Sequence, residues 1–308
     1  MEKRCLIDDN PYSNLYVDLT ERCNMDCNFC YNPERSKADL DPGYFAEACA
    51  RLPGPVHWRF LGGEPTLNRH FFELLEIALR HKHTVYFASN GILYNDPAFM
   101  QRLARYSGKI TVGLSMDGGT AGEKFYRLLN NRDCLGFKLQ ALENLHRYGI
   151  KRVCLSAIIV RGENERVIGE LYEAARHYSD SVRYIHYRSA AMIGRWINTE
   201  PYSLEDLKRL TRPYFTEEAF SPGCLREINC NGGDGECCYR FRPEPRLQIS
   251  LIEFATTRSA KCPYRGKLLQ EGFFIEPFFA NMIKCNSASA ARQGEVSPHA
   301  PPQNVKVA

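Results

Sequence analysis

Between residues 15 and 190 the chain alternates six times between a short apolar segment of strand-like composition and a longer segment with helical spacing. The strand-like segments, rich in Val, Ile, Phe and Tyr, are residues 15–20, 56–61, 84–88, 109–115, 152–160 and 181–188. Strands that alternate with helices pair in parallel, because each helix returns the chain to the same edge of the sheet. The order predicts an α/β fold with helices outside a parallel sheet. Six units are too few for a closed eight-unit barrel, so an open sheet and a partial barrel both fit.

Helices are expected in the intervening segments. Asp41-Pro42 and Asp96-Pro97 each have the pattern of a helix start, since proline fits the first helical turn. Apolar residues three and four positions apart predict further helices at 71–79, 137–145 and 163–178. After the repeat, Ser203 is expected to cap another helix, and residues 247–254 are expected to form one more strand.

The composition changes along the chain and suggests a division into four parts. These are an N-terminal lead-in, the strand–helix repeat, a Cys-rich C-terminal extension and a tail with few apolar residues, at 1–14, 15–215, 216–285 and 286–308. The tail is expected to be disordered, because it has too little apolar surface to bury. The aromatic tract at 273–279 is expected to pack in the core and close the open side of the barrel.

Overall composition excludes several classes of protein. With 44% hydrophobic and 25% charged residues the chain is ordinary globular material and not a collagen or a coiled coil. The net charge of +4 is mild and no Lys/Arg run occurs, so no nucleic-acid partner is expected, although an anionic substrate would fit. No apolar run reaches the roughly 18–20 residues of a membrane span. The charged start, Met1 to Cys5, lacks a signal-peptide core, so a cytoplasmic protein is expected.

The 13 cysteines are many for a reducing compartment, where disulfides are rare. Cys49, Cys134 and Cys154 stand alone and are expected to be buried thiols. Cys23, Cys27 and Cys30 form a C-x3-C-x2-C loop directly after the first strand, at the edge of the sheet where α/β proteins place their ligands. Three thiolates can hold an iron–sulfur cluster and leave one iron open to a ligand. A zinc site with a fourth ligand elsewhere is the alternative.

Four landmarks at four consecutive strand ends carry a family resemblance. Besides the cysteine loop, with Phe29 before its last Cys, they are Gly62-Gly63-Glu64-Pro65, Ser89-Asn90-Gly91 and Ser115-Met116-Asp117-Gly118. Over about residues 15–190 this pattern resembles the radical S-adenosylmethionine (radical SAM) superfamily. The resemblance implies a partial (β/α)6 TIM-like barrel followed by a Cys-rich C-terminal extension.

The resemblance also implies cofactors and their contacts. Cys23, Cys27 and Cys30 would bind a [4Fe-4S] cluster whose fourth iron is chelated by S-adenosylmethionine (SAM). Gly62, Gly63 and Glu64 would meet the methionine amino group, and the other cofactor-binding residues would be Phe29, Ser89, Asn90, Ser115, Asp117 and Ile158. Ser115 and Asp117 are expected near the ribose or carboxylate, and Phe29 and Ile158 beside the adenine. An electron donor such as flavodoxin or ferredoxin would reduce the cluster, and reductive cleavage of SAM would start radical chemistry on a peptide or small molecule.

Six further cysteines follow residue 220: Cys224, Cys230, Cys237, Cys238, Cys262 and Cys285. Three interpretations stay open. They hold an auxiliary iron–sulfur cluster, although their spacing departs from the usual C-x2-C units. Alternatively, they present a metalloid such as trivalent arsenic for SAM-derived alkyl transfer, because converging thiols suit a thiophilic ion. In the third they are free thiols on a loop. A non-catalytic zinc-binding module is the hypothesis from a different class.

Overall fold

The computed structural model describes residues 5–10, 13–30, 39–190, 200–220, 238–253, 266–268 and 274–277. Its strands are β1 (Cys5–Leu6), β2 (Asn14–Thr20), β3 (His57–Gly62), β4 (Thr84–Phe87), β5 (Ile110–Ser115), β6 (Val153–Ile159), β7 (Val182–Ser189), β8 (Cys238–Glu244), β9 (Leu247–Ile252), β10 (Gly266–Leu268) and β11 (Phe274–Pro277). Its α-helices are α1 (Pro42–Arg51), α2 (Phe71–Arg80), α3 (Pro97–Ala104), α4 (Glu123–Asn130), α5 (Leu135–Arg147), α6 (Val167–His177) and α7 (Leu204–Thr211). Short 3₁₀ turns are η1 (Ile7–Asp9), η2 (Pro65–Leu67), η3 (Ile92–Asn95) and η4 (Arg212–Tyr214).

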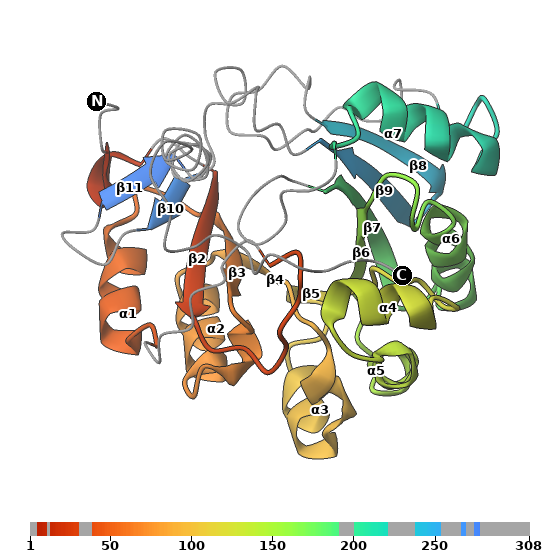
Figure 1. Ribbon diagram of the computed structural model, residues 1–308. Helices are drawn as coiled ribbons and strands as arrows, with labels where there is room; N and C mark the ends of the chain where they lie inside the picture. Colours follow the sequence, from red (N-terminus) through yellow and green to blue (C-terminus); the bar gives the residue numbers. More distant parts are fainter. Residues whose placement is uncertain are drawn as a thin grey trace, which may run out of the picture.

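In the described part of the chain all strands belong to one sheet, in the order β1-β11-β10-β2-β3-β4-β5-β6-β7-β9-β8. Strands β2 to β7 are parallel and are the six predicted segments, with bounds that differ by a residue or two. Figure 1 shows them as a curved row with α1 to α6 on the convex side. The fold is therefore the predicted mixed α/β arrangement of a partial barrel.

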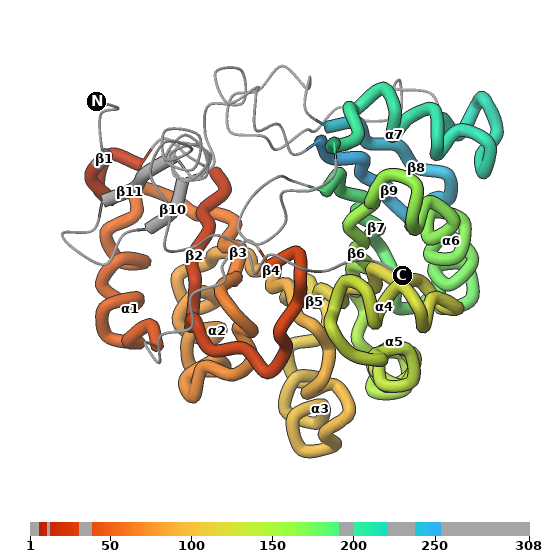
Figure 2. Tube along the Cα trace, viewed as in Figure 1, coloured from red at the N-terminus to blue at the C-terminus, as the bar shows by residue number. Residues whose placement is uncertain are grey.

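C-terminal segments extend the sheet at both edges. Figure 2 shows β8 and β9 next to β7. The predicted strand at 247–254 is β9, which pairs in parallel with β7 and carries the antiparallel β8. At the other edge β10 pairs in parallel with β2, and β11 connects β10 to β1. Part of the aromatic tract thus lies in β11, which β10 separates from the first barrel strand β2. The tail at 286–308 lies outside the described residues, and the four-part division of the chain stays a prediction.

Helix starts follow the expected capping chemistry. The Asp41 carboxylate accepts from the backbone N–H of Tyr44, and Asp96 caps α3 in the same way, each with proline in the first turn. Ser203 and Asp206 form a capping box at the start of α7. The helix expected at 163–178 begins only at Val167. Residues before it form a turn, because the Asn164 side chain is used to hold backbone groups of Asp117, Ile158 and Val160.

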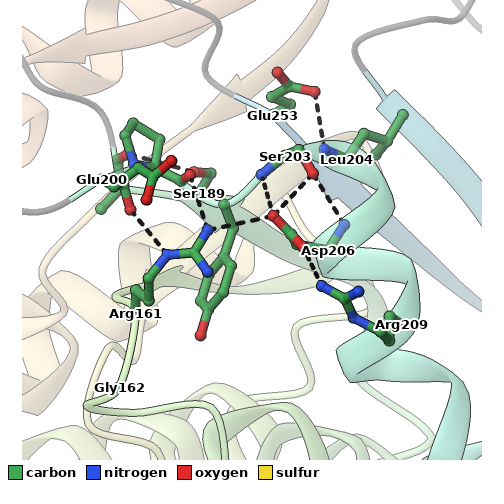
Figure 3. A network of polar contacts seen from close by, with 12 residues as sticks. Arg161, Gly162, Ser189, Glu200, Ser203, Leu204, Asp206, Arg209 and Glu253 are labelled. Carbon is green, nitrogen blue, oxygen red and sulfur yellow. Dashed lines mark hydrogen bonds and ion pairs between the residues drawn. The ribbon is translucent and has the colours of Figure 1, made fainter.

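Helix α7 is fixed to the barrel by a polar network (Figure 3). Arg161, which follows β6, donates to the Asp206 carboxylate at 3.3 Å, and the same carboxylate accepts from Ser203 at the start of α7. Burial raises the pKa of Asp206, but these hydrogen bonds outweigh burial and hold the pKa below its ordinary value. Glu253, directly after β9, accepts from the backbone N–H of Leu204 at 2.8 Å. The network therefore connects α7 to the ends of two sheet strands.

The core lies between the convex face of the sheet and the helices. Trp58 and Phe60 alternate along β3 and are fully buried, and their rings stack edge-to-face on Phe45 of α1 at 5.0 and 5.7 Å. Full burial of such a side chain contributes roughly 1.5–3 kcal/mol. The isolated Cys49, Cys134 and Cys154 are buried, as predicted. Over the described residues, no helix has the length and apolar character that crossing a membrane requires.

Candidate functional site

The cysteine loop lies at the carboxyl end of β2, beside the ends of the neighbouring strands. Cys23, Cys27 and Cys30 are partly exposed and form no disulfide. A turn in which the Cys30 N–H donates to the Cys27 carbonyl at 3.3 Å shapes the end of the loop. Cys23 and Cys27 both pack on an apolar cluster that contains Met25, Tyr126 and Cys134. One of the isolated cysteines, Cys134, therefore lies next to the predicted metal ligands.

Helix α4, which sequence reasoning missed, holds the cysteine loop. Asn28 donates twice to its last turn, from the side chain to the Leu128 carbonyl and from the backbone to the Leu129 carbonyl, both at 2.7 Å. These carbonyls have no partner within a helix, so the loop satisfies them. The next residue, Asn130, is buried and donates its side-chain N–H to Cys27 Sγ at 3.2 Å. The pattern of Phe125, Tyr126 and Leu129 is the signal that could have revealed this helix.

The Gly62-Gly63-Glu64 segment packs directly against the start of the cysteine loop. Gly63 N–H donates to the Thr20 carbonyl and Glu64 N–H to the Arg22 carbonyl, both at 2.7 Å. A Cβ on Gly62, whose φ is +123°, would clash with the Thr20 backbone, and one on Gly63 would clash with the Arg22 carbonyl. Glycine is required here because two backbones meet. From the sequence, these glycines were predicted to let the backbone come close to a ligand. The structure shows that they also let it pack against the protein's own cysteine loop.

The Glu64 carboxylate links the ends of β3 and β4. It is buried and accepts from the Thr66 hydroxyl at 2.6 Å and from the Asn90 backbone N–H at 2.8 Å. The Asn90 side chain in turn donates to Asn24 in the cysteine loop at 2.8 Å. Burial raises the pKa of Glu64, and the hydrogen bonds from Asn90, Thr66 and Ser89 oppose that rise. The predicted cofactor residues Glu64, Ser89 and Asn90 therefore form one connected rim with the cysteine loop.

Ser115 and Asp117 form the next part of this rim. Asp117 is buried and accepts from the Ile158 backbone N–H at 2.9 Å, which joins the end of β5 to the end of β6. Below it the fully buried Lys138 of α5 donates to the Ser115 carbonyl at 2.6 Å. Burial raises the pKa of Asp117 and lowers that of Lys138, while their mutual attraction opposes both shifts. A lysine on an amphipathic helix gives no sequence signal of such a position.

An apolar surface lies between the cysteine loop and the end of β6. Phe29 and Ile158, both predicted to flank an adenine, are partly exposed and pack in the same cluster. Its buried members are Phe125, Leu129, Val160 and Ala190. The structure thus brings together two residues that are more than a hundred positions apart in the chain, from the loop after β2 and from β6.

The cysteines of the C-terminal group are described at one position only. Cys238 begins β8, is buried and pairs in register with Ile252 of β9. Cys224, Cys230, Cys237, Cys262 and Cys285 lie outside the described residues. The auxiliary cluster, the thiol-bound metalloid and the free thiols all stay predictions.

The donor set of the loop fits an iron–sulfur cluster. Burial raises the pKa of Cys27 to about 12, against the hydrogen bond from Asn130 and the charge of Lys138. A thiol that binds a metal loses its proton, and a hydrogen bond to the ligating sulfur stabilises the resulting thiolate. Among the described residues, no three Cys, His, Asp or Glu side chains converge on a single ion. A cubane cluster does not need such convergence, since each iron takes its own thiolate.

Comparison with known proteins agrees with this geometry. Residues 17–175, about half of the chain, match the family model of the radical SAM superfamily, so the chain belongs to that superfamily. Members of the superfamily use a [4Fe-4S] cluster and SAM, and membership indicates an enzyme of the radical SAM class.

Curated relatives cover several chemistries. The chain is 28% identical over 223 residues to 7,8-dihydro-6-hydroxymethylpterin dimethyltransferase of Methanocaldococcus jannaschii, which covers 67% of this chain and 43% of the relative. It is 24% identical over 217 residues to GTP 3′,8-cyclase of Aquifex aeolicus, covering 67% of this chain and 66% of that enzyme. With mycofactocin maturase MftC of Mycobacterium tuberculosis the identity is 28% over 173 residues, or 54% and 42% of the two chains. The chain therefore spans less than two thirds of each relative.

Solved structures show the same fold. Streptococcus suis SuiB bound to S-adenosylmethionine superposes with a TM-score of 0.61 at 17% identity, over 86% of this chain and 60% of SuiB. SuiB bound to the precursor peptide SuiA gives a TM-score of 0.56 at 20% identity, over 66% and 45% of the two chains. At these identities the likeness concerns the partial-barrel fold alone.

Proposed function

We propose that this chain binds a [4Fe-4S] cluster through Cys23, Cys27 and Cys30 and cleaves SAM reductively to start radical chemistry on a small molecule or a peptide. The observation that carries the proposal is the held cysteine loop: a thiol triplet at the strand ends, with Asn130 donating to Cys27 and the glycine segment packed beneath it. When bound, the cluster and SAM supply the electron transfer and the radical, and the protein supplies orientation and protection.

The residues of the rim have separate tasks in this proposal. Asn130 and the buried Lys138 place an N–H donor and a positive charge beside the thiolates, which offsets their negative charge. Glu64 and Asp117 fix neighbouring strand ends, so the backbone groups around them keep their positions for SAM. Phe29 and Ile158 offer the apolar surface for the adenine. An external flavodoxin or ferredoxin would deliver the electron.

The substrate class is inferred from the relatives and from a solved structure of the same fold. Relatives include enzymes named for a pterin, for GTP and for mycofactocin, and SuiB was solved with a precursor peptide. Both a small molecule and a peptide are therefore compatible with the family.

Iron analysis tests the proposal. Anaerobically purified wild type should contain iron and sulfide, and with reductant and SAM it should release 5′-deoxyadenosine. The Cys23/Cys27/Cys30→Ala variant should lose both the iron of this loop and the SAM cleavage. Cys49→Ala, which removes a buried thiol in α1, is the matched control and should keep both.

The outcomes separate the remaining hypotheses. About four irons left in the triple variant, the content of one cubane, would indicate an auxiliary cluster on the C-terminal cysteines. Zinc in place of iron, without any SAM cleavage by the wild type, would contradict the proposal and favour the zinc-binding module.

A further inference from the structure

The concave side of the sheet carries polar and aromatic residues that the proposed chemistry at the rim does not use. The rings of Tyr86 on β4 and His186 on β7 lie 6.1 Å apart between their centroids. Strands β5 and β6 separate these two strands, which places their backbones about 14 Å apart along the sheet at the usual spacing. The rings can meet only across the inside of the curve. Tyr86 and His186 therefore point into the barrel lumen.

Two arginines lie on the same side. The Arg59 guanidinium lies over the rings of Tyr16 and Tyr86, at 5.7 and 5.3 Å from their centroids. Arg188 Nη2 lies 3.5 Å from His186 Nδ1. Burial raises the pKa of Tyr86 to about 12, and the charges of Arg188 and Arg59 oppose that rise. The two cations thus approach the same phenol from β3 and β7.

The charges of these two arginines are not paired within the described residues. In the part of the chain that the structure describes, neither Arg59 nor Arg188 forms an ion pair with a carboxylate, and Asp18 of β2, in register with Leu61, has contacts of its own. Within that same part, the buried Arg59 Nε and Ser250 Oγ have no hydrogen-bond partner. Ser250 lies next to His186 in the sheet register. Buried donors without partners are rare in proteins and indicate that something else satisfies them.

The glycine at position 113 lets Tyr86 lie close against β5. Gly113 of β5 has no side chain, and a Cβ there would lie 2.9 Å from the Tyr86 hydroxyl. The tyrosine therefore turns into space that any other residue at position 113 would fill. Inward-facing residues such as Arg59, His186 and Arg188 are only partly buried, in contrast to their fully buried outward neighbours.

We propose that Arg59, Tyr86, His186 and Arg188, the lumen arginine site, bind the phosphate or carboxylate group of an anionic small-molecule substrate. Arginine recognises both groups through paired N–H donors. Arg59 precedes Gly62 by three residues, about 10 Å along the strand, so it lies below the rim. Arg188 is in register with Ile158 at the rim. An anionic group held here would direct the rest of the substrate toward the cysteine loop. This inference rests on the proposed function, because that function supplies the radical chemistry at the loop.

Calorimetry on the anaerobic, iron-loaded enzyme with bound SAM tests the site. Pyrophosphate is the phosphate probe and succinate the carboxylate probe, and at least one should bind saturably at millimolar concentration. Arg59→Met and Arg188→Met should each weaken that binding by about tenfold or more, the loss of a charge-assisted hydrogen bond. Iron content and SAM affinity should stay at wild-type values. Arg176→Met removes an equal charge from the exposed face of α6 and should bind the probe normally.

Several outcomes would overturn the site without touching the cluster proposal. One is wild type that holds iron and SAM but binds neither probe. Another is equal binding in the lumen variants and in Arg176→Met. Loss of SAM affinity in Arg188→Met would place that arginine in the SAM site instead. If Arg59→Met does not fold, Arg59→Lys keeps the charge without the fork and should bind the probe more weakly than wild type; full affinity in that variant counts against the site. Failure of the cluster proposal shows separately, as wild type without iron.

Discussion

The two faces of the parallel sheet have opposite chemistry, although alternate residues of the same strands build them. On β3 the outward Trp58 and Phe60 are fully buried under α1, while Arg59 between them is half-buried in the lumen. On β7 the outward Tyr187 is fully buried, whereas its neighbours His186 and Arg188 face inward. A strand has a period of two, so one segment can stabilise the fold with one face and bind a ligand with the other.

The rim formed by the strand ends differs from both faces of the sheet. There the backbone itself is packed tightly, as at Gly63, and polar side chains such as Glu64 and Asp117 connect neighbouring loops. Stability and chemistry are separable on the two faces of the sheet. At the rim they coincide, because the residues that fix the loops also set the position of the thiols.

The largest effect is expected at Phe60, and its neighbour Arg59 on β3 provides the comparison. Phe60→Ala should lower the free energy of unfolding by about 3–5 kcal/mol, since it leaves a cavity in the core. Arg59→Met, one position away, should cost about 1 kcal/mol or less, because its side chain faces the lumen. Anaerobic urea unfolding of both variants measures this. Equal losses would contradict the separation of the two faces.

At the rim, a single substitution should affect both the stability of the protein and its iron content. Gly63→Ala should destabilise the protein by about 1–3 kcal/mol, because the new Cβ meets the Arg22 carbonyl. The displaced loop should also retain less iron. Gly136→Ala in α5, where a Cβ meets no atom within 4 Å, is the control and should be neutral or slightly stabilising. Normal iron content in a folded Gly63→Ala protein would show that the loop adjusts without cost.

A polar change at the rim should affect chemistry more than packing. Asn130→Leu removes the donor to Cys27 Sγ, and loss of such a partner typically weakens metal binding about 10–100-fold. The cluster should also become harder to reduce, because its thiolate loses a hydrogen bond. Chelator challenge and a redox titration followed by electron paramagnetic resonance measure these effects. Asn95→Leu, which loses a bond to the Phe137 carbonyl instead, should leave both unchanged.

Per unit of pH, the smallest effect concerns a histidine on the inner face. Burial, followed by the charges of Arg59 and Arg152, lowers the pKa of His57 to about 3. The folded protein keeps this histidine neutral, while the unfolded chain takes up a proton below about pH 6.5. The free energy of unfolding therefore falls by about 1.4 kcal/mol per pH unit as the pH drops from about 6.5 toward 3. Unfolding midpoints across that range should fall less steeply in His57→Gln. Parallel pH profiles of the two proteins would contradict the prediction.

Much of the fold was predictable because its signals are local. Alternating apolar segments gave the six parallel strands, and Asp41, Asp96 and Ser203 marked helix starts through their own capping bonds. The cysteine loop was predictable from its spacing, since the three thiols lie within eight residues. Helix α4 escaped because no capping side chain marks its start, which follows Gly122. The role of Asn130 escaped with it. The late start of α6 escaped because Asn164 bonds to the loop after β5 and to the end of β6.

The sequence by itself determined the class of fold, the cysteine loop and the landmarks of the superfamily, because spacing along the chain and residue chemistry suffice for these. Only the tertiary structure decided which distant groups surround the loop. It places Lys138 under Ser115, Asn130 on Cys27, and Arg59 of β3 and His186 of β7 against the ring of Tyr86. Curvature of the sheet is the physical reason, because it brings together side chains from strands that are not neighbours. No local pattern in the chain records that proximity.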